Sequence, residues 1–145
     1  MGDLGYAKSF KDLAVYQKAK VISASVFQLS KSFPRDELHS LTDQIRRSCR
    51  SIGAQIAEAW GKRRYEKHFI SKLTDADAEQ HETQHWLGEA RDSGYIAAEQ
   101  ADQILKELLS VGRMLNAMIA KANLFCGSDA DRVREELAEY IVSSE

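Results

Sequence analysis

The chain has 145 residues, of which 43% are hydrophobic, and carries 20 Lys and Arg against 22 Asp and Glu. This length and composition predict one soluble domain over residues 1–145, and no apolar run approaches the ~18 residues of a membrane span. Residues 1–6 lack the basic and apolar regions of a signal peptide, so we expect a cytoplasmic protein. The two cysteines form no Cys-x-x-Cys pair, and we expect no disulfide.

The first predicted helix runs from about residue 12 to residue 32, and Pro34 ends it because proline disfavours the helical conformation of the preceding residue. Its apolar residues recur at gaps of 3 and 4 and are Val15, Ala19, Ile22, Val26, Leu29 and Phe33. The second predicted helix runs from about residue 36 to residue 60 and stops at Gly61. Its apolar face consists of Leu41, Ile45, Cys49, Ile52, Ile56 and Trp60.

The outer side of the second helix is basic and carries small side chains. Segment 44–72 holds eight Lys and Arg against Glu58 and Glu66. These candidate nucleic-acid or interface residues are Arg46, Arg47, Arg50, Lys62, Arg63, Arg64, Lys67 and Lys72. The small residues Gly53, Ala54 and Ala57 would let another molecule come close. The charges either pair across the fold or form a polarised surface that faces nucleic acid or an acidic neighbour.

The third predicted helix spans about residues 65–92, with Gly94 as its C-terminal cap, and the fourth spans about 97–123, before Gly127. Their apolar residues are Phe69, Leu73, Ala76, Leu87 and Ala90, then Ile104, Leu108, Val111, Leu115, Met118 and Ala122. Gln80, Thr83 and Gln84 occupy inward positions of the third helix. Because a buried polar group without a partner costs about 1–3 kcal/mol, they must hydrogen-bond a neighbouring helix or face another subunit.

Short connections predict an all-α, antiparallel, up-down-up-down four-helix bundle with a core over about residues 10–124. The acidic tail, residues 128–145, could form a short fifth helix with its apolar residues on one side. Those residues are Val133, Leu137, Tyr140 and Ile141.

Residues 81–85 read H-E-x-x-H, in which two histidines one turn apart can share a Zn²⁺ while the glutamate activates bound water. However, Arg91 stands where the extended motif has a third histidine, and a cation there would repel the metal. Helical geometry places His81 and His85 roughly 100–140° from the apolar side of their helix. A zinc-dependent hydrolase acting through His81, Glu82 and His85 is therefore a remote alternative, and we expect no enzyme activity, cofactor or metal.

Four motifs resemble the bacterial four-helix-bundle proteins encoded by 23S rRNA intervening sequences. They cover about residues 10–124. They comprise segment 10–19, Phe33-Pro34 with Glu37, then Gln44-Ile45-Arg46-Arg47-Ser48 with Ser51-Ile52 and Ile56-Ala57-Glu58, and finally Glu82-Thr83-Gln84 with Trp86-Leu87, Asp92 and Gly94-Tyr95. The chain departs from the family pattern at Gln55, where Asn is common, and at Ala59, where Gly is common.

The resemblance implies a homo-oligomer, a pentamer, with no established activity. Relatives include a retroelement accessory protein that binds a reverse transcriptase and nucleic acid, so RNA or another nucleic acid is the expected partner. Subunit-interface candidates are Gly53, Ala54, Ala57, Glu82, Gln84 and Trp86. The alternative is a structural assembly, or one with a protein partner, in which the basic segment meets the acidic third helix of the next subunit. The slightly acidic chain, with a pI of about 6.1, is unlike many nucleic-acid modules.

Overall fold

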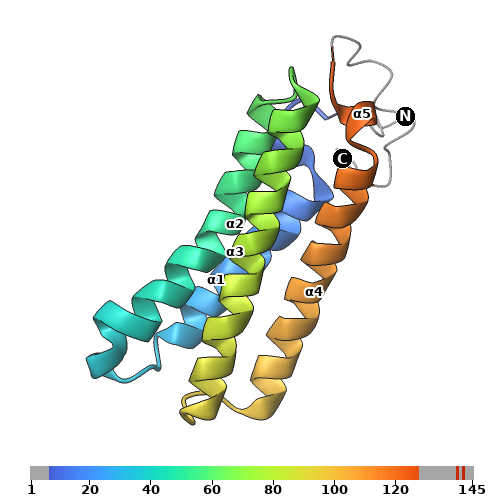
Figure 1. Cartoon of the computed structure of the whole chain (residues 1–145). Helices are drawn as coiled ribbons and strands as arrows, with labels where there is room; N and C mark the ends of the chain where they lie inside the picture. Colours follow the sequence, from blue (N-terminus) through green and yellow to red (C-terminus); the bar gives the residue numbers. More distant parts are fainter. Residues whose placement is uncertain (1–6, 128–139, 141, 143–145) are drawn as a thin grey trace.

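The computed structural model describes residues 7–127, 140 and 142, and the regular elements of that part are all helices, without a β-strand. Its long helices are α1 (Ala14–Ser30), α2 (Asp43–Gly61), α3 (Glu66–Asp92) and α4 (Ala98–Ala120) (Figure 1). The all-helical class and the four long helices are as predicted. None of the described helices is long and apolar enough to cross a membrane.

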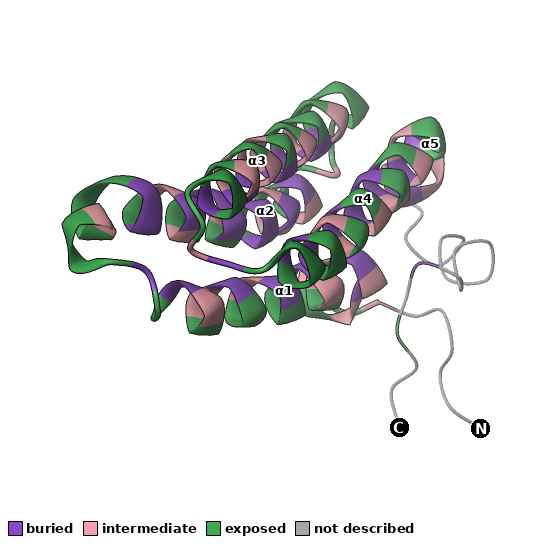
Figure 2. Cartoon of the chain, turned by 90° about the horizontal axis from the view of Figure 1, so that it is seen from below, coloured by how far each residue is buried: buried purple, intermediate pink, exposed green. Residues whose placement is uncertain are grey.

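The four long helices pack around one core. α1 lies against α2 and α4, and α3 lies against the same two helices. Buried residues line the inner sides of the helices and exposed residues their outer sides (Figure 2). The α1–α2 and α3–α4 connections lie at one end of the bundle and the α2–α3 connection at the other (Figure 1).

The predicted apolar faces form the core. Almost all of the apolar positions named above for the four long helices are buried, and the exceptions, Leu29 and Trp60, are half-buried against the same cluster. Cys49 behaves as a small buried hydrophobe, and its burial raises the pKa of its thiol to about 12. Cys49 and Cys126 are both free thiols in the structure.

Local capping explains where two elements begin and end. The Ser9 hydroxyl accepts from the Lys11 backbone N–H, and Asp12 accepts from the backbone N–H of Ser9, so a capping box begins the 3₁₀ turn η1 (Phe10–Asp12) just before α1. After α3, Gly94 has φ +80° and Tyr95 N donates to Ala90 O at 3.0 Å, the bond of a Schellman motif. Gly94 therefore caps α3, as the sequence predicts.

The start of the second helix differs from the prediction. Instead of a continuous α-helix from about residue 36, a 3₁₀ turn (η2, Arg35–Glu37) and a π-helical turn (η3, Leu38–Thr42) precede α2. The Glu37 carboxylate anchors these turns, because it accepts hydrogen bonds from Ser40 Oγ and from Tyr95 Oη, both at 2.7 Å. Hydrogen bonds from Ser40 and Tyr95 lower the pKa of Glu37. Apolar periodicity begins only at Leu41 and could not reveal these turns.

The end of the fourth helix also differs slightly. α4 stops at Ala120, and the short α5 (Ala122–Phe125) follows it. Phe125 stacks on Phe69 and contacts the ring of Tyr140, which is buried. The predicted helix in the acidic tail otherwise lies outside the described residues.

The inward polar residues of α3 hydrogen-bond within the chain. Thr83 Oγ1 donates to Ser48 Oγ of α2 at 3.0 Å, and both residues are fully buried. Gln84 Nε2 donates to Gln80 Oε1 at 2.7 Å, and Gln80 Nε2 donates to Asp77 Oδ1 at 3.0 Å. These bonds confirm the first of the two predicted solutions, bonding to a neighbouring helix, for Thr83.

Candidate functional site

The outer face of α2 carries a depression of about 610 Å³. Eight residues line it: Leu38, His39, Asp43, Arg46, Arg47, Arg50, Ser51 and Ala54. A second depression of about 270 Å³ shares Arg50 and Ala54 with it and continues along the α1–α2 groove to Ala57. The predicted basic, small-residue side of the helix is thus hollowed along most of its length.

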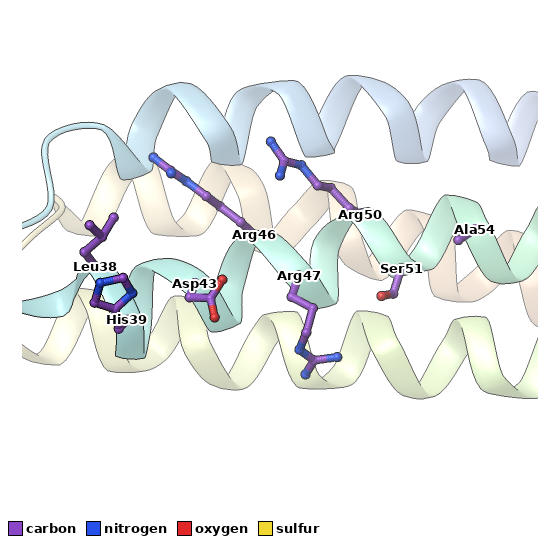
Figure 3. A pocket seen from close by; sticks show the side chains of 8 residues that line it. All are labelled: Leu38, His39, Asp43, Arg46, Arg47, Arg50, Ser51 and Ala54. Carbon is purple, nitrogen blue, oxygen red and sulfur yellow. The ribbon is translucent and has the colours of Figure 1, made fainter.

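The arginines leave α2 in two directions. Arg46 and Arg50 extend toward α1, whereas Arg47 extends toward α3 (Figure 3). This division follows from helical geometry, because residues four apart share a face whereas successive residues are about 100° apart. It separates the three arginines into two chemical settings.

Toward α1, three cations surround one aromatic ring. The guanidinium carbons of Arg46 and Arg50 lie 4.7 and 5.1 Å from the centroid of Phe27, and Lys31 Nζ lies 5.0 Å from it. Arg46 Nε also donates to Ser30 Oγ at 2.7 Å. We call Phe27, Lys31, Arg46 and Arg50 the α1–α2 basic cluster. The ring and the serine hold the Arg46 guanidinium in place and leave its terminal nitrogens free to donate.

The α1–α2 basic cluster lacks internal countercharges. Within residues 7–127, no carboxylate lies within 4.0 Å of the charged nitrogens of Lys31, Arg46 or Arg50. Cation–π contacts contribute about 0.5–1 kcal/mol each at exposed sites, which partly offsets the mutual repulsion of the cations. A bound anion would relieve the remaining repulsion.

Toward α3, Arg47 has a partner. Its Nη2 lies 2.5 Å from Glu82 Oε2, which also accepts from Trp86 Nε1 at 3.0 Å. The pair is half-exposed, so it contributes at most about 1 kcal/mol. The charge pairing between the basic and acidic helices that the sequence suggested therefore occurs, at this position, inside one chain. Gln84, another interface candidate, bonds to Gln80.

The remaining predicted cations also divide into those that have partners within the chain and those that are exposed. Lys72 Nζ pairs with Glu58 at 3.1 Å and lies 3.7 Å from Asp75. Arg63 lies over Trp60 at 3.5 Å, and burial lowers its pKa. Three further cations stay exposed around the α2–α3 turn: Lys62, Arg64 and Lys67.

Of the small residues, Gly53 is buried while Ala54 is exposed and Ala57 half-buried. A Cβ at Gly53 would lie 3.5 Å from the Tyr16 ring, so the neighbour that approaches this glycine is α1 of the same chain. Ala54 keeps a surface that another molecule can reach.

The two histidines of the H-E-x-x-H motif are exposed, as their predicted angle implied. His81 Nδ1 lies 2.8 Å from Asp77 O, and the His85 ring packs edge-on against Trp86. No group of three or more His, Cys, Asp or Glu side chains placed to hold a metal occurs among residues 7–127, 140 and 142.

Sequence reasoning missed Phe27 and Lys31, which complete the cluster from α1. Their spacing of four residues puts them on one helix face, and that was the only available signal. Whether this face meets Arg46 depends on the register between α1 and α2, which periodicity does not give.

Comparison with known proteins identifies similar chains. Residues 11–117 match the family model described as 23S rRNA-intervening sequence protein. A crystal structure of a protein of unknown function from the S23 ribosomal protein family of Bacteroides thetaiotaomicron is 30% identical, with a TM-score of 0.66, over 73% of this chain and 98% of the other. No curated protein matches the sequence.

Proposed function

Because this chain belongs to the family of 23S rRNA-intervening sequence proteins, we propose that it is a non-enzymatic protein that associates with RNA through the α1–α2 basic cluster. The observation that carries this proposal is the convergence of Lys31, Arg46 and Arg50 on Phe27, with no carboxylate of residues 7–127 within 4.0 Å of their charged nitrogens. Phosphate is the ligand that such cations favour, since arginine donates two parallel hydrogen bonds to it. The names of the family and of the solved neighbour refer to rRNA and to a ribosomal protein family, which supports RNA as the nucleic acid.

The depression beside the cluster supports the same proposal. Ser51 and Ala54, which line it, carry short side chains, so a phosphate chain could approach the helix closely. Arg47 contributes less than its neighbours because Glu82 holds it. The proposed contacts are therefore made chiefly by Arg46, Arg50 and Lys31, with Lys20 farther along the groove.

The test is RNA binding measured by fluorescence anisotropy at low salt. The double variant Arg46→Gln/Arg50→Gln should weaken binding by about tenfold or more, because charge-assisted hydrogen bonds are lost. Arg113→Gln removes an exposed cation from α4 and serves as the matched control. Equal affinity of the double variant and the control would remove the cluster from RNA binding.

Self-assembly of antiparallel, up-down-up-down bundles is a second candidate. The alternating ends of the connections in Figure 1 support that topology. Two exposed apolar side chains could be covered by a second copy: Val21 on α1, 67% exposed, and Leu38 at the start of the second helix, 46% exposed. The expected homo-oligomer, a pentamer, would be seen as a mass of five chains by light scattering. A monomer at micromolar concentration would end this candidate.

A further inference from the structure

The α2–α3 turn carries exposed aromatic rings among cations. Tyr65 is 56% exposed, and the guanidinium carbon of Arg64 lies 5.7 Å from its ring centroid. The His68 ring lies 5.4 Å from Tyr65, edge-on. From Lys62 to Lys67 the sequence holds four Lys and Arg against Glu66 alone. Aromatic faces and positive charge therefore occupy the same short segment.

Tyr65 has no side-chain capping role and no place in the core of the fold. It is the residue before α3, where Ser, Thr, Asp or Asn would cap the helix, and its side chain makes no capping hydrogen bond. It also lies outside the hydrophobic core and outside the set of residues packed on it. Trp60, by contrast, packs against the core and is covered by Arg63, whose Nε donates to Trp60 O at 2.9 Å. Tyr65 is thus an exposed ring beside cations, with no capping bond and no place in the core, and a ligand can reach the part of it that Arg64 and His68 do not cover.

We propose that Tyr65 stacks against an unpaired nucleobase while Lys62, Arg64 and Lys67 neutralise the adjoining phosphates. The ligand class is then single-stranded RNA, because in a duplex the base faces are covered by their neighbours and no base can lie on the ring. This inference rests on the proposed function and deepens it, since it states which form of RNA the protein selects.

The position of the turn fits one continuous strand. At about 1.5 Å per residue, Lys62 lies roughly 18 Å along α2 from Arg50. The α1–α2 groove runs along this interval as far as Ala57, the last residue to line it. A single strand held by phosphate contacts at the α1–α2 basic cluster can thus extend to the turn and place a base on Tyr65.

The experiment compares a single-stranded RNA of about 12 nucleotides, a length within the site sizes of single-strand-binding folds, with a duplex of the same sequence. Tyr65→Leu keeps an apolar side chain but removes the π-face, and Tyr65→Phe keeps the face. We expect Tyr65→Leu to weaken single-strand binding by about tenfold and Tyr65→Phe to bind like the unmodified protein. Duplex affinity should not change with either variant. A 2-aminopurine base in the strand should be quenched on binding to the unmodified protein and to Tyr65→Phe only.

The outcomes separate the two proposals. Equal binding of single strand and duplex, or a Tyr65→Leu variant that binds like Tyr65→Phe, overturns the stacking site and leaves the α1–α2 basic cluster in place if Arg46→Gln/Arg50→Gln still loses affinity. Binding of neither RNA by the unmodified protein overturns both.

Discussion

Replacing Gly112 by alanine should destabilise the protein, although alanine is normally the better helix former. Gly112 is buried in α4, opposite the hydrogen-bonded side chains of Asp77 and Gln80 on α3. A Cβ at this position would lie 3.0 Å from Gln80 Nε2 and 3.4 Å from Asp77 Oδ1. Gln80 is itself buried and tied at both ends of its amide, to Asp77 and to Gln84, so it cannot move away without weakening a hydrogen bond.

The magnitude follows from two opposing effects. Exchanging glycine for alanine inside a helix stabilises it by roughly 0.5–1 kcal/mol. Weakening the two amide hydrogen bonds of a buried glutamine costs about 1–3 kcal/mol. We therefore expect Gly112→Ala to lower the free energy of unfolding by about 1 kcal/mol. Gly88 in α3 is the matched control, because nothing lies within 4 Å of the Cβ that alanine would add there. Gly88→Ala should stabilise by up to about 1 kcal/mol.

Chemical denaturation of both variants measures the difference. The double variant Gln80→Ala/Gly112→Ala extends the test, because without the Gln80 amide the added methyl group should cost little, so Gly112→Ala should then be neutral or stabilising relative to Gln80→Ala. If Gly112→Ala stabilised the protein as much as Gly88→Ala does, the close contact between α3 and α4 would not constrain the fold and the reasoning would be refuted.

Two further perturbations test the polar contacts. Thr83→Val should lower the free energy of unfolding by about 1–2 kcal/mol, because it leaves the buried Ser48 hydroxyl of α2 without this partner. Thr74 is the control, since its hydroxyl makes the same kind of bond to a backbone carbonyl at an exposed position. Thr74→Val should cost under about 0.5 kcal/mol in the same denaturation assay. Tyr95→Phe removes a donor to Glu37, whose folded-state pKa is lowered by hydrogen bonds from Ser40 and Tyr95. A carboxyl with a lowered folded-state pKa contributes fully to stability above the ordinary glutamate pKa of about 4.3, and this contribution is lost as the pH falls through the lower folded value. The stability deficit of Tyr95→Phe should therefore be present at neutral pH and shrink on acidification. A stability deficit that grows toward low pH in melting experiments would contradict this.

Periodicity predicted the helices well because burial dominates their interiors. The gaps of 3 and 4 residues between Val15 and Phe33 identify a face that the structure buries almost throughout. The ends of the helices were harder to predict from the sequence. In the 3₁₀ and π turns before α2, the Glu37 carboxylate accepts a hydrogen bond from Tyr95, 58 residues away, and no local pattern indicates such a contact.

The candidate site was predicted in part, for a similar reason. The cluster of arginines on α2 was evident from spacing alone. However, the sequence could not show that Arg47 is paired with Glu82, 35 residues away, while Arg46 and Arg50 share the ring of Phe27. That division depends on which helix lies on each side of α2. It decides which cations remain available to a ligand.

The most direct test of the RNA proposal is the salt dependence of single-stranded RNA affinity. For single strands, the logarithm of the binding constant falls with the logarithm of salt concentration by about 0.7 per phosphate contact. We predict that binding weakens steeply with salt and that Arg46→Gln/Arg50→Gln reduces the slope by about 1.4, with Arg113→Gln leaving it unchanged. An identical slope for the double variant and the unmodified protein would contradict the assignment of these arginines to RNA phosphates.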